Sequence, residues 1–79
     1  MNRSELLAIV GDEKGLMEVT LAKGEKFAFH VSYLQALNTY VSYPANEVWI
    51  CVGGNEYQVA NSEHEIMEMR EKALKELNK

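Results

Sequence analysis

Apolar and polar residues alternate along two stretches in the first half of the chain, with the two-residue period of a half-buried β-strand. Residues 16–21 alternate in this way, and residues 27–31 repeat the pattern after a short link that contains Gly24. Glycine adopts the backbone angles of tight turns at low cost. The two stretches are therefore predicted to form an antiparallel hairpin.

A second pair of strand patterns, residues 47–52 and 56–60, flanks Gly53 and Gly54. Two glycines tolerate the positive φ angles of a tight hairpin turn. The first of these strands has two apolar faces: Val48, Ile50 and Val52 on one, and Trp49 and Cys51 on the other. The first face is expected to lie on the core of the sheet. The second face needs another cover, either the C-terminal helix or another protein chain.

Residues 62–77 show the pattern of an amphipathic helix. Ser62 and Glu65 have the spacing of a capping box, in which each side chain bonds the other residue's backbone N–H. Apolar residues recur at steps of three and four, and two more widen the stripe: Ile66, Met69, Ala73 and Leu77, with Met67 and Leu74. One side of this helix is expected to be buried.

Two shorter segments are predicted from weaker patterns. Apolar residues between 33 and 40 lie at helical spacing after Ser32, a possible cap, which predicts a helix of about two turns. Pro44 cannot continue that helix. Residues 6–10 are apolar but too few for periodicity to separate strand from helix, and a strand is favoured.

The 79 residues form one domain, residues 1–79, because a chain of this length supports a single core. The predicted order is β-β-β-α-β-β-α, or β-β-α-β-β-α if residues 6–10 are not a strand. The predicted fold class is α+β. It comprises a small twisted antiparallel sheet of four or five strands, partly rolled, with a short helix and a C-terminal amphipathic helix packed on it.

The formal charge of −4 gives no electrostatic reason to bind nucleic acid, where clustered Lys and Arg displace counterions. A single cysteine cannot form an internal disulfide, which favours a cytoplasmic location. The apolar run at residues 6–10 is shorter than the core of a signal peptide and far shorter than a membrane span. We therefore expect neither nucleic acid nor a membrane as partner.

Residues with catalytic or ligating chemistry are few. Cys51, His30 and His64 lack the close paired spacing of zinc ligands, so no metal is expected. A Cys51–His30 dyad would need neighbouring strands, an orienting group and an oxyanion site, and the sequence places none of these. Glycines 53 and 54 join two strands and do not form a phosphate loop. We predict no catalytic residues, no cofactor and no enzymatic activity.

The order of features from Gly24 to Ile66 resembles the small flagellum-associated FlbD-like proteins. The shared features are turn and capping motifs: Gly24-Glu25-Lys26-Phe27, a short helix with Leu34 and Leu37, Pro44, Gly54-Asn55-Glu56-Tyr57-Gln58-Val59, and Ser62 with Glu65-Ile66. The resemblance covers about half of the chain. It implies a small, non-enzymatic accessory or regulatory protein of bacterial type, and it transfers no functional residues.

Large apolar residues beyond the needs of a small core predict protein–protein contact, with another protein or with a copy of the same chain. The candidate contact residues are Tyr40, Tyr43, Trp49, Met67 and Leu74. One alternative is an acidic inhibitor, encoded by a phage or mobile element, of a host nucleic-acid enzyme or defence protein. It would be favoured by clustering of Asp12, Glu18, Glu47 and Glu56. A second alternative is a small-ligand binder with a pocket at a subunit interface, lined by tyrosine and His30.

Overall fold

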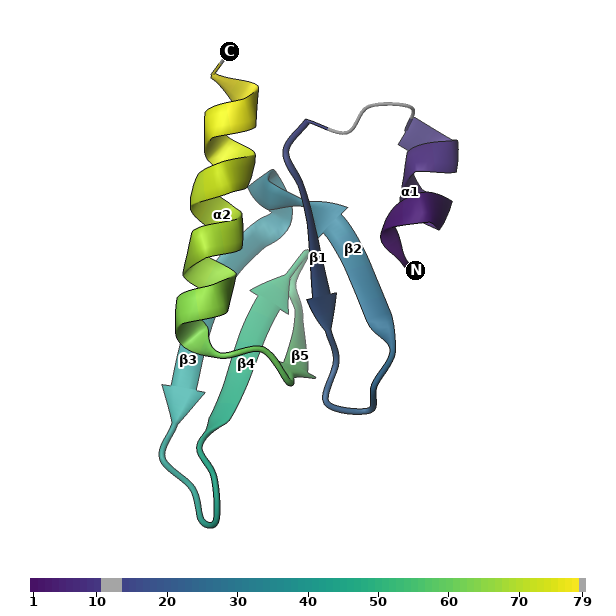
Figure 1. The fold of residues 1–79 in the computed structure, drawn as a ribbon. Helices are drawn as coiled ribbons and strands as arrows, with labels where there is room; N and C mark the ends of the chain where they lie inside the picture. Colours follow the sequence, from purple (N-terminus) through teal and green to yellow (C-terminus); the bar gives the residue numbers. More distant parts are fainter. Residues whose placement is uncertain (11–13, 79) are drawn as a thin grey trace.

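The computed structural model describes residues 1–10 and 14–78. The fold is α+β, as predicted, with helices at both ends and strands between them (Figure 1). In chain order the elements are α1 (Arg3–Val10), β1 (Leu16–Thr20), β2 (Lys26–His30), the 3₁₀ turn η1 (Val31–Tyr33), β3 (Leu34–Tyr40), β4 (Glu47–Val52), β5 (Asn55–Val59) and α2 (Glu63–Leu77).

The strands form two antiparallel sheets, whereas one sheet was predicted. Strands β1 and β2 form a two-stranded sheet, and β3, β4 and β5 form a three-stranded sheet in that order. A single bridge between Leu21 and Val59 joins the two sheets. Strand pairing within each sheet involves only neighbours along the chain, as the turn signals predict. The described residues form five strands, within the predicted range.

The two glycine turns have the predicted geometry. Gly53 and Gly54 between β4 and β5 have φ angles of +58° and +87°, which residues with a Cβ rarely adopt. Gly24, between β1 and β2, also has a positive φ. Both hairpins therefore follow from local turn chemistry.

The predicted strand at residues 6–10 is wrong, because this segment belongs to helix α1. The Asn2 side-chain oxygen accepts a hydrogen bond from the Glu5 backbone N–H, 2.9 Å away. This is the contact of an N-cap residue, and Asn is among the preferred caps. Helix α1 packs against β1 and β2.

The predicted helix at residues 33–40 is also wrong, because these residues form η1 and the long strand β3. Strand β3 pairs with β4, but the register shifts between Leu34 and Ala36. Leu34 pairs with Val52 and Leu37 pairs with Ile50, so both leucines lie on the core side although they are three residues apart. The irregularity thus reproduces helical spacing within a strand. Ser32 caps no helix.

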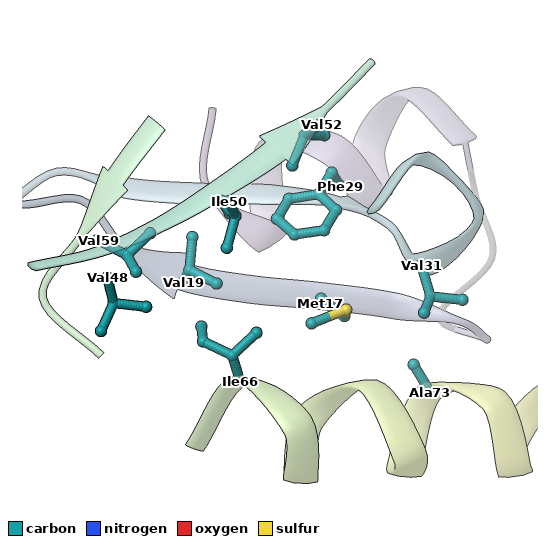
Figure 2. Packing of buried hydrophobic residues seen from close by; sticks show 10 residues of the cluster. All are labelled: Met17, Val19, Phe29, Val31, Val48, Ile50, Val52, Val59, Ile66 and Ala73. Carbon is teal, nitrogen blue, oxygen red and sulfur yellow. The ribbon is translucent and has the colours of Figure 1, made fainter. Parts of the chain in front are cut away.

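The core lies between the two sheets and α2 (Figure 2). Met17 and Val19 of β1, together with Ile50 of β4, are almost fully buried. Helix α2 contributes Ile66, which has no exposed surface, and Ala73. The capping box that begins this helix is present as predicted: the Ser62 hydroxyl accepts the Glu65 N–H, and the Glu65 carboxylate accepts the Ser62 N–H.

Candidate protein interface

Strand β4 separates a buried face from an open one. Val48, Ile50 and Val52 are buried, whereas Trp49 and Cys51 point the other way and are only half-buried. The strand register aligns further residues with these two. We call this surface the outer face, and it comprises Ala36, Asn38 and Tyr40 of β3, Glu47, Trp49 and Cys51 of β4, and Glu56 and Gln58 of β5.

Neither helix covers the outer face. Helix α2 places Ile66 and Ala73 in the core that contains Val48 and Ile50, which is the opposite side of the sheet. Helix α1 packs on the two-stranded sheet. One of the two covers expected for Trp49, the C-terminal helix, is therefore wrong, and the sheet is open on the side of Trp49.

Trp49 is at the centre of the outer face. It lies opposite Asn38 of β3 and Gln58 of β5. Its indole Nε1 donates a hydrogen bond to the Glu47 carboxylate, with 3.1 Å between nitrogen and oxygen. This bond fixes one edge of the ring, and the side chain as a whole is half-buried.

A groove of about 380 Å³ lies beside the Trp49 ring, between the β1–β2 turn and strand β5. Its lining is mixed in character: Leu21, Ala22, Lys23, Glu25, Trp49, Glu56, Tyr57 and Gln58. The lining contains charges of both signs together with apolar and aromatic side chains. Such a surface suits a protein side chain with an apolar body and polar rim contacts.

The β3–β4 hairpin carries exposed aromatic and apolar side chains beyond the sheet. Tyr43 is 95% exposed and Val41 is 93% exposed, and Tyr40 at the end of β3 is half exposed. We call residues 41–46 the hairpin tip. It projects away from the rest of the molecule (Figure 1). Tyr40 and Tyr43, both predicted contact residues, thus lie on or next to the outer face.

Met67 and Leu74, the other two predicted contact residues, belong to a different surface. Both are on α2, where Met67 is exposed and Leu74 is half-buried against the core. The structure therefore groups three of the five predicted residues around the outer face and separates two. Val41, which lies between the two tyrosines and is 93% exposed, was not among the predicted contact residues.

The cysteine and the histidines have separate partners. The Cys51 thiol donates to the Gln35 side-chain oxygen at 3.3 Å, and the same oxygen accepts the Gly54 N–H at 2.7 Å. His30 belongs to the other sheet, where its Nδ1 lies 2.7 Å from the Ser32 hydroxyl. The structure does not bring Cys51 and His30 together as a dyad. Within residues 1–10 and 14–78, no group of three His, Cys, Asp or Glu side chains is placed to hold a metal ion.

The acidic residues are spread over several surfaces. Glu18 accepts a hydrogen bond from the Arg3 N–H and lines a hollow beside α2. Glu47 and Glu56 lie on the outer face, and Asp12 lies outside the described residues. The three described members of the expected acidic cluster therefore do not share one surface.

Glu65 serves the capping box. The pKa of this carboxyl is lowered mainly by the hydrogen bond that it accepts from the Ser62 backbone N–H. The Ser62 hydroxyl and His64 lower the pKa further. His64 also lies 2.8 Å from Glu68, one helical turn further along α2. These groups stabilise the start of the helix.

No protein-family model, curated protein or solved structure matches the chain. In the part of the chain that the structure describes, no helix is long and apolar enough to cross a membrane.

Proposed function

We propose that this protein is a small, non-enzymatic, cytoplasmic module that binds another protein through the outer face and the hairpin tip. The observation that carries the proposal is the outer face, which neither helix covers, with the half-buried Trp49 at its centre and two exposed tyrosines beside it. Trp and Tyr contribute more than most residues to binding energy at protein interfaces, because each buries a large rigid surface and keeps a polar group for hydrogen bonding.

The exposed area is consistent with a missing partner. The chain exposes 5410 Å², whereas a folded monomer of 9.0 kDa is expected to expose about 4,850 Å². The excess is about 560 Å², and a stable interface buries about 800 Å² on each partner.

The polar residues around Trp49 favour a transient, non-obligate complex with the partner. Asn38, Glu47 and Gln58 surround the indole, so the face is not continuously apolar. A mixed face of this kind remains hydrated when it is free, and it resembles the interfaces of non-obligate complexes. An accessory or regulatory role, which the likeness to FlbD-like proteins also implies, fits such a contact.

Site-specific photocrosslinking in the expressing cells tests the proposal. The photoreactive residue p-benzoylphenylalanine is placed at Gln58 on the outer face, at Tyr43 on the hairpin tip, or at Glu71 on the exposed side of α2 as a matched control. We expect discrete adducts with the same other protein from the first two positions and none from Glu71. Trp49→Ala in the same chain should abolish the Gln58 adduct.

Two results would contradict the proposal. One is the absence of any discrete adduct from Gln58 and Tyr43 while a known complex crosslinks in the same cells. The other is an identical set of adducts from Glu71, which would show non-specific encounter. Circular dichroism of the purified Trp49→Ala variant shows whether the fold is retained.

A small-ligand role is a second candidate, favoured by one observation. His30 and Tyr33 line a hollow of about 300 Å³ together with Leu6, Lys14, Leu16, Ala28, Phe29 and Leu77. A mainly apolar hollow with two polar rings is typical of small-molecule sites. A thermal-shift panel of metabolites and nucleotides tests this role. A shift that is lost in His30→Ala supports it, and no shift across the panel counts against it.

A further inference from the structure

The edges of the two sheets differ in how they are protected. An uncovered edge strand presents unpaired backbone N–H and C=O groups, and folded proteins usually block it. Helix α1 packs against β2, and the Ala28 N–H bonds the Met1 carbonyl at 2.6 Å. The edges of β1 and β5 meet at the Leu21–Val59 bridge. There the Ala22 N–H donates to Gln58 and the Ala60 N–H donates to Thr20.

Strand β3 differs from these edges: helix α2 contacts it, but among the described residues no second strand and no backbone hydrogen bond from outside its sheet reaches it. It has β4 on one side and no strand on the other. It is seven residues long, and its sequence, LQALNTY, contains no charged residue and no proline. Charged residues, proline and bulges are the usual means of blocking an edge. The one irregularity lies between Leu34 and Ala36, so residues 36–40 remain regular.

We propose that β3 pairs with β3 of a second copy of this chain, antiparallel and about a twofold axis. Three strands from each copy then form one continuous sheet of six. The charge of this edge favours a copy of the chain as partner. The chain carries a net charge of −4, but the neutral strand places no like charges opposite each other when it pairs with itself.

The flank of α2 beside β3 fits the same contact. Met69 lines a hollow with Leu16 and Met17 of β1, so this side of α2 faces the two-stranded sheet. Met67 lies on the opposite flank, since helical residues are separated by about 100°, and α2 also contacts β3 and η1. Leu74 lies on the same flank, two turns further on. In the dimer, this flank of α2 would lie next to the same flank of the second copy. Met67, which is 52% exposed in the single chain, would then be covered by the partner.

The dimer has a consequence for the outer face. A twofold axis perpendicular to the sheet keeps both outer faces on the same side, so two Trp49 rings would share one wide surface. The inference goes beyond the proposed function and does not depend on it, because it rests on the edge of β3 and not on the outer face.

Light scattering across a dilution series measures the association. We expect a dimer that dissociates on dilution. Asn38 is exposed and is the middle residue of the regular stretch 36–40, so it lies near the axis when this stretch pairs with its copy. Asn38→Lys then brings two like charges close together and should weaken dimerisation by about tenfold or more. Asn55→Lys makes the same change at an exposed position of β5 and should leave the dimer unchanged. Trp49→Ala should also leave it unchanged, which separates this test from that of the proposed function.

Hydrogen exchange at two protein concentrations locates the contact. The N–H groups of β3 that point away from β4 should exchange more slowly in the dimer than in the dilute monomer, in wild type but not in Asn38→Lys. Three results overturn the inference: a monomer at every concentration, a dimer that Asn38→Lys does not weaken, or a dimer in which β3 exchanges as fast as in the monomer.

Discussion

Replacing Ile66 by alanine tests the placement of α2 on the buried face of the three-stranded sheet. Ile66 has no exposed surface, and Figure 2 shows its side chain directed toward Val19 and Val48. If α2 lies on this face, Ile66 is a central contact between the helix and both sheets. If α2 instead covered Trp49, position 66 would be far less sensitive to substitution.

The expected cost follows from the atoms removed. Ile→Ala deletes three carbon atoms at about 0.8 kcal/mol each, or ~2.4 kcal/mol, and the cavity left behind adds to this. We expect a loss of about 3 kcal/mol. A domain of 79 residues is stable by roughly 4–12 kcal/mol. The loss is therefore a large share of the total, and it lowers the melting temperature by roughly 12–24 °C.

Urea unfolding measures this loss by two signals. Helical circular dichroism reports on α2, and fluorescence of Trp49, the single tryptophan, reports on the three-stranded sheet. Met67→Ala is the matched control at the adjacent, exposed position, and it should change the free energy of unfolding by less than about 0.5 kcal/mol. Measurements at two protein concentrations separate any effect of association. An Ile66→Ala cost below about 1 kcal/mol, or one equal to the control, would refute the placement of α2.

Four further substitutions have defined outcomes. Ser62→Ala should cost about 1 kcal/mol in urea titration. The lowered pKa of Glu65 means that its ionised form stabilises the fold at neutral pH and that this contribution is lost below about pH 4. The stability difference from Glu65→Gln should therefore shrink on acidification, and a constant difference would contradict this. Gly54→Ala should cost about 1–2 kcal/mol because φ is positive, and an unchanged midpoint would refute it. Cys51→Ser should preserve both fold and crosslinks, since serine also bonds Gln35; lost adducts with an intact fold would implicate the thiol.

The features that could be predicted from the sequence are those that depend on local chemistry. The hairpins follow from alternation and from glycines at positive φ, and the start of α2 follows from the Ser62–Glu65 pair. The same logic was available for α1, because Asn2 and Glu5 have capping spacing. The strand prediction considered residues 6–10 by their apolar run alone, and this run begins after the capping residue Asn2. A short amphipathic pattern is therefore better interpreted together with its cap.

Strand β3 could not be recognised from periodicity. The register shift after Leu34 makes the leucines recur at three residues, and only the pairing with β4 shows that they share a face. The candidate interface could also be predicted only in part, because it depends on tertiary packing. The sequence shows that both faces of β4 are apolar, but the face that α2 covers is decided by tertiary packing. Tyr40 and Tyr43 are exposed and Trp49 is half-buried outside the core cluster, and the role of all three in binding stays a prediction.

The bridge between Leu21 and Val59 also bears on how the chain folds. Every other strand pairing joins neighbours in sequence, and such local contacts form quickly because little chain entropy is lost in closing short loops. The β1–β2 hairpin and the β3–β4–β5 meander can thus each form early. We therefore expect the slow step of folding to be the docking of these two units across the bridge, with α2 packing on both. Substitutions at this junction should lower the folding rate more than substitutions in either hairpin turn.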